Sequence, residues 1–185
     1  MHTRHTDTGV GHAHGAPFGA SAPMRMEDAG QAPIGLSVEV ASWVAGLKPA
    51  DVPDDVRKKL RLLLLDALGS ATHGRSQTWS EQVKTWLLRH PSAASDGLAT
   101  LWGDAKPSLR PSDAAFGNGV FVHAFEFDDY HNAKVHPSCA IVPAVLAVAQ
   151  ARNIGGERIL LALAAGYEVM IRSALALNPA FTRVR

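Results

Sequence analysis

Large apolar residues recur at spacings of three and four along most of the chain after Ile34, which predicts a succession of amphipathic helices. Caps, glycines and prolines bound the expected helices at about 36–47, 51–74, 79–90, 111–127, 136–151 and 157–178, with Asp51 as the cap of the second. The segment 97–103, between two glycines, is extended in pattern but has no evident partner strand. Helices with short connections predict an all-α, bundle-like domain.

The expected helices differ in the faces that they should bury. Trp79 and Trp86 share one face of the third helix, and two tryptophans so placed are typical of a core. On the fourth helix, Phe116, His123 and Phe127 share a face. The fifth helix is apolar on nearly all sides, which predicts that it is buried.

Composition restricts the functional classes. The 185 residues are 46% hydrophobic with a net charge of +1, which is typical of a globular protein with one sizeable core. Basic residues form no stripe, so we expect no nucleic-acid partner. We expect no membrane partner either, since Glu168 and Arg172 interrupt the longest apolar segment. The single cysteine, Cys139, excludes an intrachain disulfide and favours a cytoplasmic location.

Residues 1–33 differ in composition from the rest of the chain. They are rich in glycine and have few large apolar residues, so they cannot offset the entropy cost of ordering. We therefore expect a disordered tail over 1–33, followed by a helical domain over 34–185. Four of the nine histidines lie in this tail: His2, His5, His12 and His14. We expect them to have adventitious metal affinity at most.

Ionisable and hydroxyl side chains are concentrated where the fourth helix gives way to the fifth. Glu126 or Asp128 could take or give a proton, His136 could act as its partner, and Tyr130 could donate a hydrogen bond. The start of the fifth helix, near Ser138, could bind a substrate carboxylate through its free backbone N–H groups. This set of groups is typical of proton abstraction beside a carboxylate, followed by elimination or re-protonation.

Two other interpretations of the same stretch are weaker. One is a metal site, with five possible ligands: His123, Glu126, Asp128, His131 and His136. Their spacing matches no strong zinc pattern, so metal-free chemistry is favoured. A cysteine nucleophile is the other, but Cys139 has aliphatic neighbours, which favours a buried structural thiol. Taken alone, His123 on an apolar helical face is more typical of a core histidine.

Four short motifs in this stretch carry a resemblance to a known family. Asn118-Gly119, His123-Ala124, the run 125–131 (FEFDDYH) and 136–138 (HPS) resemble the N-terminal helical domain of the MmgE/PrpD family. The resemblance covers about 34–185 and implies a metal-independent and cofactor-free lyase or isomerase, such as a 2-methylcitrate dehydratase. It also implies a small di- or tricarboxylate as substrate and a homodimer as the assembly.

The resemblance implies roles for individual residues. By position in the motif, the catalytic residues would be Glu126, Tyr130 and His136. Glutamate and tyrosine stand where the family most often has aspartate and threonine, so the substrate and the reaction outcome are expected to differ from methylcitrate dehydration. Four further residues would bind substrate or support the site: Asp128, Asp129, His131 and Ser138.

Family members are much longer than this chain. The resemblance places a second α+β domain, with further catalytic residues, beyond Arg185, so we expect a truncated domain with an incomplete site. The alternative is a non-catalytic helical dimerisation module, or a degenerate fragment, in which the fifth and sixth helices provide the interface.

Overall fold

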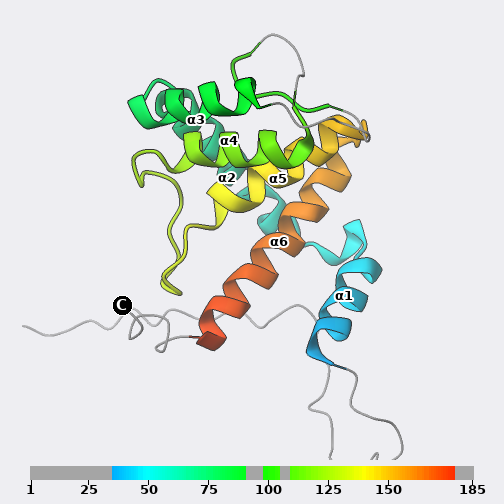
Figure 1. Ribbon diagram of the computed structural model, residues 1–185. Helices are drawn as coiled ribbons and strands as arrows, with labels where there is room; N and C mark the ends of the chain where they lie inside the picture. The colour runs from blue at the N-terminus through cyan, green and yellow to red at the C-terminus, as the bar shows by residue number, and fades with distance from the viewer. Residues whose placement is uncertain (1–34, 91–97, 105–108, 178–185) are drawn as a thin grey trace, which may run out of the picture. The chain divides into compact units, whose positions relative to one another are not determined.

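A computed structural model describes residues 35–90, 98–104 and 109–177, so the predicted tail lies outside the described residues. The chain divides into units Met1–Gly35 and Leu36–Arg185, and the described helices lie in the second. Its helices are labelled in Figure 1 and follow one another in chain order: α1 (Leu36–Gly46), the short 3₁₀ helix η1 (Pro49–Asp51), α2 (Asp54–Gly74), α3 (Thr78–Arg89), α4 (Pro111–His123), α5 (Pro137–Ala151) and α6 (Gly156–Leu177).

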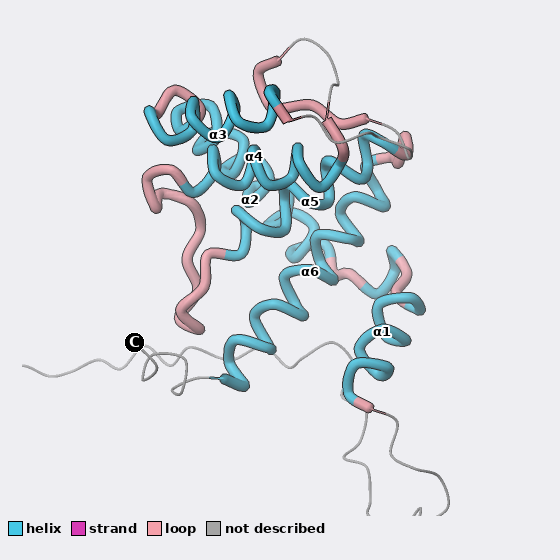
Figure 2. The backbone as a smooth tube through the Cα atoms, in the orientation of Figure 1, coloured by secondary structure: helices cyan, strands magenta, loops and turns pink. Residues whose placement is uncertain are grey.

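The all-α prediction is confirmed, since the described ranges contain helices and loops but no strand (Figure 2). The middle helices pack on one another: α4 contacts α2, α3 and α5, while α5 also contacts α2 and α6. The fifth helix is largely buried, as expected, with Ile141, Val142 and Ala147 in the core. The stretch that is rich in ionisable and hydroxyl side chains connects α4 to α5, so both of its ends lie on this core.

The extended segment before α4 is attached to the core by an asparagine. The Nδ2 of buried Asn118 donates to the Thr100 carbonyl at 3.0 Å, and its Oδ1 accepts from the Trp102 amide at 2.8 Å. The sequence showed no partner strand for this segment. The segment does pair at one position, where Ala99 forms an isolated antiparallel β-bridge with Leu109.

The predicted faces of α3 and α4 are wrong. Trp79 and Trp86 are 48% and 56% exposed, whereas Ser80 and Leu87 face the core. Phe116 of α4 is likewise exposed. Each buried face combines small residues, which allow neighbouring backbones to approach, with large apolar ones, since Phe121 of α4 is buried as well.

Two predicted helix ends also require correction. The fourth helix ends at His123 rather than near Phe127, because the backbone turns at Glu126, whose φ is 52°. His123 and Glu126 are therefore not neighbours on one helix surface. Asp51 does not cap α2, which begins at Asp54; it lies in η1, and its carboxylate accepts a hydrogen bond from the Lys48 amide at 2.8 Å.

Within the described ranges, α6 is long and apolar enough to cross a membrane by length and composition alone. By that criterion the expectation that Glu168 and Arg172 interrupt the segment is wrong; the two side chains form an ion pair one turn apart. A core helix passes the same test, and α6 contacts α2 and α5.

Two glycines set the distances between the helices that bear the site. A Cβ on Gly74, at the end of α2, would lie 1.9 Å from the carbonyl oxygen of Phe121 in α4. A Cβ on Gly119 would lie 2.8 Å from the carbonyl oxygen of Cys139 in α5. Backbone atoms cannot move aside as a flexible side chain can, so both contacts require glycine.

Gly74→Ala should destabilise the domain by about 1–3 kcal/mol, because the added methyl group overpacks the contact between α2 and α4. Gly69 provides a matched control in the same helix, since nothing lies within 4 Å of the position that its Cβ would take. Gly69→Ala should instead stabilise the domain by about 0.5–1 kcal/mol through helix propensity. Urea denaturation of both variants tests the pair; equal effects would contradict the close approach.

Candidate active site

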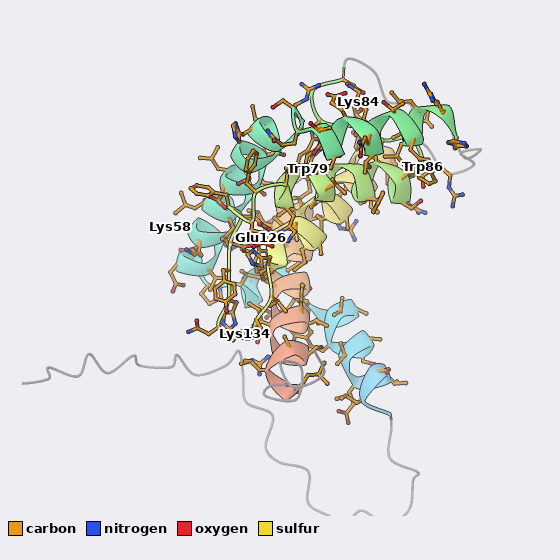
Figure 3. The ribbon with its side chains drawn as sticks, turned by 60° about the vertical axis from the view of Figure 1, so that its left-hand side comes forward. Lys58, Trp79, Lys84, Trp86, Glu126 and Lys134 are labelled. Carbon is orange, nitrogen blue, oxygen red and sulfur yellow. The ribbon has the colours of Figure 1, made fainter. Side chains whose placement is uncertain are left out.

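The candidate site lies on the connection between α4 and α5, residues 124–136. Figure 3 shows two of its residues, Glu126 near the helix ends and Lys134 farther out on the connection. The outer part folds back on itself, with the His131 amide donating to the Val135 carbonyl at 3.0 Å. This compact turn leads the chain back to His136, the N-cap residue of α5.

Asp128 is the centre of the cluster. Its side chain is 0% exposed, and its Oδ1 lies 3.0 Å from Nδ1 of His123, with which it forms a hydrogen bond. Nδ1 of His136 lies 3.3 Å from the same oxygen but is not aligned for a hydrogen bond. The two imidazole rings meet edge to face, with centroids 4.9 Å apart. A buried carboxylate thus contacts two imidazoles from opposite ends of the connection.

Asp129 fixes the connection to two helices. Its Oδ1 accepts from the Ser138 amide in the first turn of α5, and its Oδ2 accepts from the Tyr167 hydroxyl of α6, both at 2.8 Å. A carboxylate at a helix N-terminus satisfies a free N–H and complements the helix dipole. Asp129 therefore uses the Ser138 amide that was expected to be open to a substrate carboxylate.

The other predicted site residues fall into two groups. Glu126 and Tyr130 are exposed, and the Tyr130 ring lies 5.3 Å from the His136 ring between centroids. His131 and Ser138 are engaged in the fold: Nδ1 of His131 accepts from the Ala133 amide at 3.0 Å, and the Ser138 side chain is fully buried. The geometry thus brings Tyr130 and His136 together. In the described part of the chain, the Glu126 side chain forms no hydrogen bond or ion pair with the other candidates.

Cys139 lies beside this cluster, and its thiol donates to the His136 carbonyl at 3.1 Å. Burial, followed by the negative charge of Asp128, raises the pKa of Cys139 to about 12. A thiol with this pKa stays protonated at neutral pH, which agrees with the prediction that it is not a nucleophile. The neighbours of Cys139 are not all aliphatic, contrary to expectation, because the Asp128 carboxylate contributes to the raised pKa.

The position of His123 differs from the core position that the apolar face of its helix predicts. Its side chain is 41% exposed and faces Asp128. His123 and Asp128 are five residues apart in the sequence, and this separation was visible there. It brings the two side chains together only because α4 ends at His123. A helix continued to Phe127 would have moved the carboxylate away from the imidazole.

These helices and this cluster define a helical domain with a buried carboxylate and two histidines where α4 connects to α5. Comparison with known proteins agrees with that class. Residues 38–184 match the model of the MmgE/PrpD N-terminal domain, and the chain belongs to the MmgE/PrpD family. The resemblance stated from the four motifs is therefore confirmed.

Curated relatives of the chain include cis-aconitate decarboxylases. The cis-aconitate decarboxylase-like protein oryM of Aspergillus oryzae is 33% identical over 72% of this chain, and the cis-aconitate decarboxylase of Aspergillus terreus is 32% identical over 72%. The cis-aconitate decarboxylase of Homo sapiens is 32% identical over 74%. The chain spans 28% of the length of the two fungal relatives and 29% of the human one.

Tyr167→Phe should lower the free energy of unfolding by about 1.5–3 kcal/mol, because it leaves one carboxylate oxygen of Asp129 without its donor. Tyr130→Phe is the matched control, since these are the only two tyrosines and Tyr130 is exposed. The control should change stability by less than about 0.5 kcal/mol. Similar losses in both variants would show that the Asp129–Tyr167 hydrogen bond does not hold the connection.

The Cys139 thiol should react slowly with iodoacetamide in the folded chain. A pKa of about 12 in place of the ordinary 9.0 leaves roughly a thousandfold less thiolate at pH 8. Because the folded pKa is raised, the rate should keep climbing about tenfold per pH unit above pH 9, where the rate in the urea-unfolded chain levels off. Mass spectrometry of the adduct, with EDTA present, measures both rates. Equal rates at pH 8 would contradict the burial.

Proposed function

We propose that this chain supplies acid–base side chains of a lyase that acts on a small di- or tricarboxylic acid. The observation that carries the proposal is the carboxylate of Asp128, buried and in contact with His123 and His136. Membership of the MmgE/PrpD family, with cis-aconitate decarboxylases among the relatives, supports it.

His136 is the proton-transferring group in this proposal. Its side chain is 25% exposed, so it is open to a substrate on one side and contacts Asp128 on the other. A buried carboxylate 3.3 Å from Nδ1 stabilises the imidazolium that forms when this histidine takes up a proton. Asp128 is thus a positioning residue, since its own side chain is closed to solvent.

Glu126 and Tyr130 complete the proposed set. Glu126 is an exposed carboxylate able to take or return a second proton, and the Tyr130 phenol donates a hydrogen bond to an oxygen that gains negative charge. Lys134 lies over the Tyr130 ring, with Nζ 5.9 Å from its centroid, and offers a cation to a substrate carboxylate.

Two bond changes are open to such a site. In a dehydration, a base removes a proton from carbon, the C–H electrons form a double bond, and the leaving hydroxide departs as water after protonation. In a decarboxylation, the electrons of the C–C bond stay on carbon as CO2 leaves, and that carbon takes a proton from an acid. Both need a proton carrier such as His136 beside a bound carboxylate.

The proposal includes a homodimer and a cytoplasmic location. Exposed apolar side chains support an association surface, with Leu62 and Leu65 on α2 and Leu175 on α6 among them. The single cysteine, kept as a free thiol, supports a reducing compartment.

Turnover of a panel of citrate-like acids tests the proposal, with cis-aconitate first. CO2 release and product formation, followed by NMR, distinguish decarboxylation from dehydration. His136→Ala should lower the rate at least about a hundredfold, which is the usual contribution of a general acid or base. The circular dichroism spectrum should stay unchanged.

His90→Ala is the matched control, because His90 is an exposed histidine at the end of α3. It should keep full turnover. A non-catalytic association module predicts the opposite pattern, in which the chain is inert with every acid and His136→Ala changes stability or the sedimentation coefficient instead. That second candidate rests on the exposed apolar residues of α5 and α6, such as Val148 and Leu177.

A further inference from the structure

One cation on the connection between α4 and α5 forms no ion pair with any described residue. This is Lys134, whose side chain is exposed. The consecutive acids Asp128 and Asp129 do not neutralise it. Asp128 is engaged by His123, and both oxygens of Asp129 accept hydrogen bonds from α5 and α6. The positive charge of Lys134 is therefore free to bind an anion from solution.

A tight turn fixes the backbone at Lys134. The His131 carbonyl accepts from the Lys134 amide at 2.9 Å, and the His131 amide donates to the Val135 carbonyl at 3.0 Å. Ala133, within the turn, is buried. Lys134 has a φ of 65°, a conformation that few residues with a Cβ adopt. The turn thus holds the base of the lysine side chain in one place, while its end stays in solvent.

The lysine side chain extends toward the candidate site. Nζ of Lys134, which is labelled in Figure 3, lies 5.9 Å from the centroid of the Tyr130 ring. The His136 ring lies 5.3 Å from the same Tyr130 ring between centroids. A cation over an aromatic face is attracted by the negative charge of that face. The ammonium group and the imidazole of the proposed proton carrier therefore neighbour one phenol ring.

These positions indicate how the site selects its substrate. We propose that Lys134 is a specificity-determining residue, which binds a carboxylate remote from the carbon at which His136 exchanges a proton. The inference rests on the proposed function and adds that the substrate needs this second carboxylate. Proton exchange at His136 leaves the remote carboxylate unchanged, so Lys134 binds the ground state and the transition state alike. Loss of such a contact raises KM and leaves kcat nearly unchanged.

Binding of an unreactive acid tests the inference separately from turnover. Propane-1,2,3-tricarboxylate has no hydroxyl to lose and no double bond, and its affinity for the full chain is measured by NMR titration. Lys134→Asn removes the charge but keeps a residue type that tolerates a left-handed φ. It should weaken binding of this acid at least about tenfold, as expected when a hydrogen bond between charged groups is lost. Binding of the neutral trimethyl ester should not change.

Two further variants serve as controls. Lys134→Arg keeps a cation at the turn and should retain most of the affinity for the tricarboxylate. Lys58→Gln removes an exposed lysine of α2, outside the connection, and should bind as wild type. In turnover of the acid that the chain converts, Lys134→Asn should raise KM at least about tenfold and change kcat by less than about threefold.

The outcomes distinguish this inference from the proposed function. Unchanged affinity and unchanged KM in Lys134→Asn, with turnover intact, would overturn the inference and leave the lyase activity standing. Binding that depends on Lys134, without turnover of any acid, would support the carboxylate site and overturn the lyase activity. A wild-type chain that does not bind the tricarboxylate would overturn the inference whatever its turnover.

Discussion

Desolvation of two consecutive carboxylates is the constraint on which the connection and the site both depend. Placing Asp128 and Asp129 side by side against a core costs free energy unless each receives donors. Asp129 obtains them from α5 and α6, through the Ser138 amide and the Tyr167 hydroxyl. Asp128 obtains one from His123 at the end of α4. The same pairings that offset the cost therefore hold three helices around one point.

The helix packing makes these pairings possible. Gly119 lets the backbone of α4 approach that of α5 at Cys139, and Gly74 lets α2 approach α4 at Phe121. With the two ends of the connection brought close, a short chain can place imidazoles from both ends on one carboxylate. A methyl group at either glycine would separate the backbones, and contacts of about 3 Å in the site would lengthen.

The helices could be predicted from the sequence, and the buried faces of two of them could not. Proline and glycine mark helix ends through backbone chemistry that is local, which is why α5 was placed correctly from Pro137 to Ala151. The faces of α3 and α4 depend on which backbones approach, and small residues such as Ser80 lie on them beside large apolar ones such as Leu87, a mixture that the spacing of large apolar residues does not detect. For the same reason the sequence located the cluster but not the contact between Asp128 and His123, which requires the turn at Glu126.

That turn also gives two of the three acids in the run 125–131, Glu126 and Asp128, opposite exposures to solvent. The left-handed φ of 52° at Glu126 is costly for a residue with a Cβ, and it reverses the chain so that Phe127 is 84% exposed while Asp128 points into the core. A carboxylate closed to solvent can orient an imidazole but cannot reach a substrate, whereas an exposed one can exchange a proton with it. In the proposed chemistry, the strain at Glu126 thus separates a positioning carboxylate from a reacting one only two residues apart.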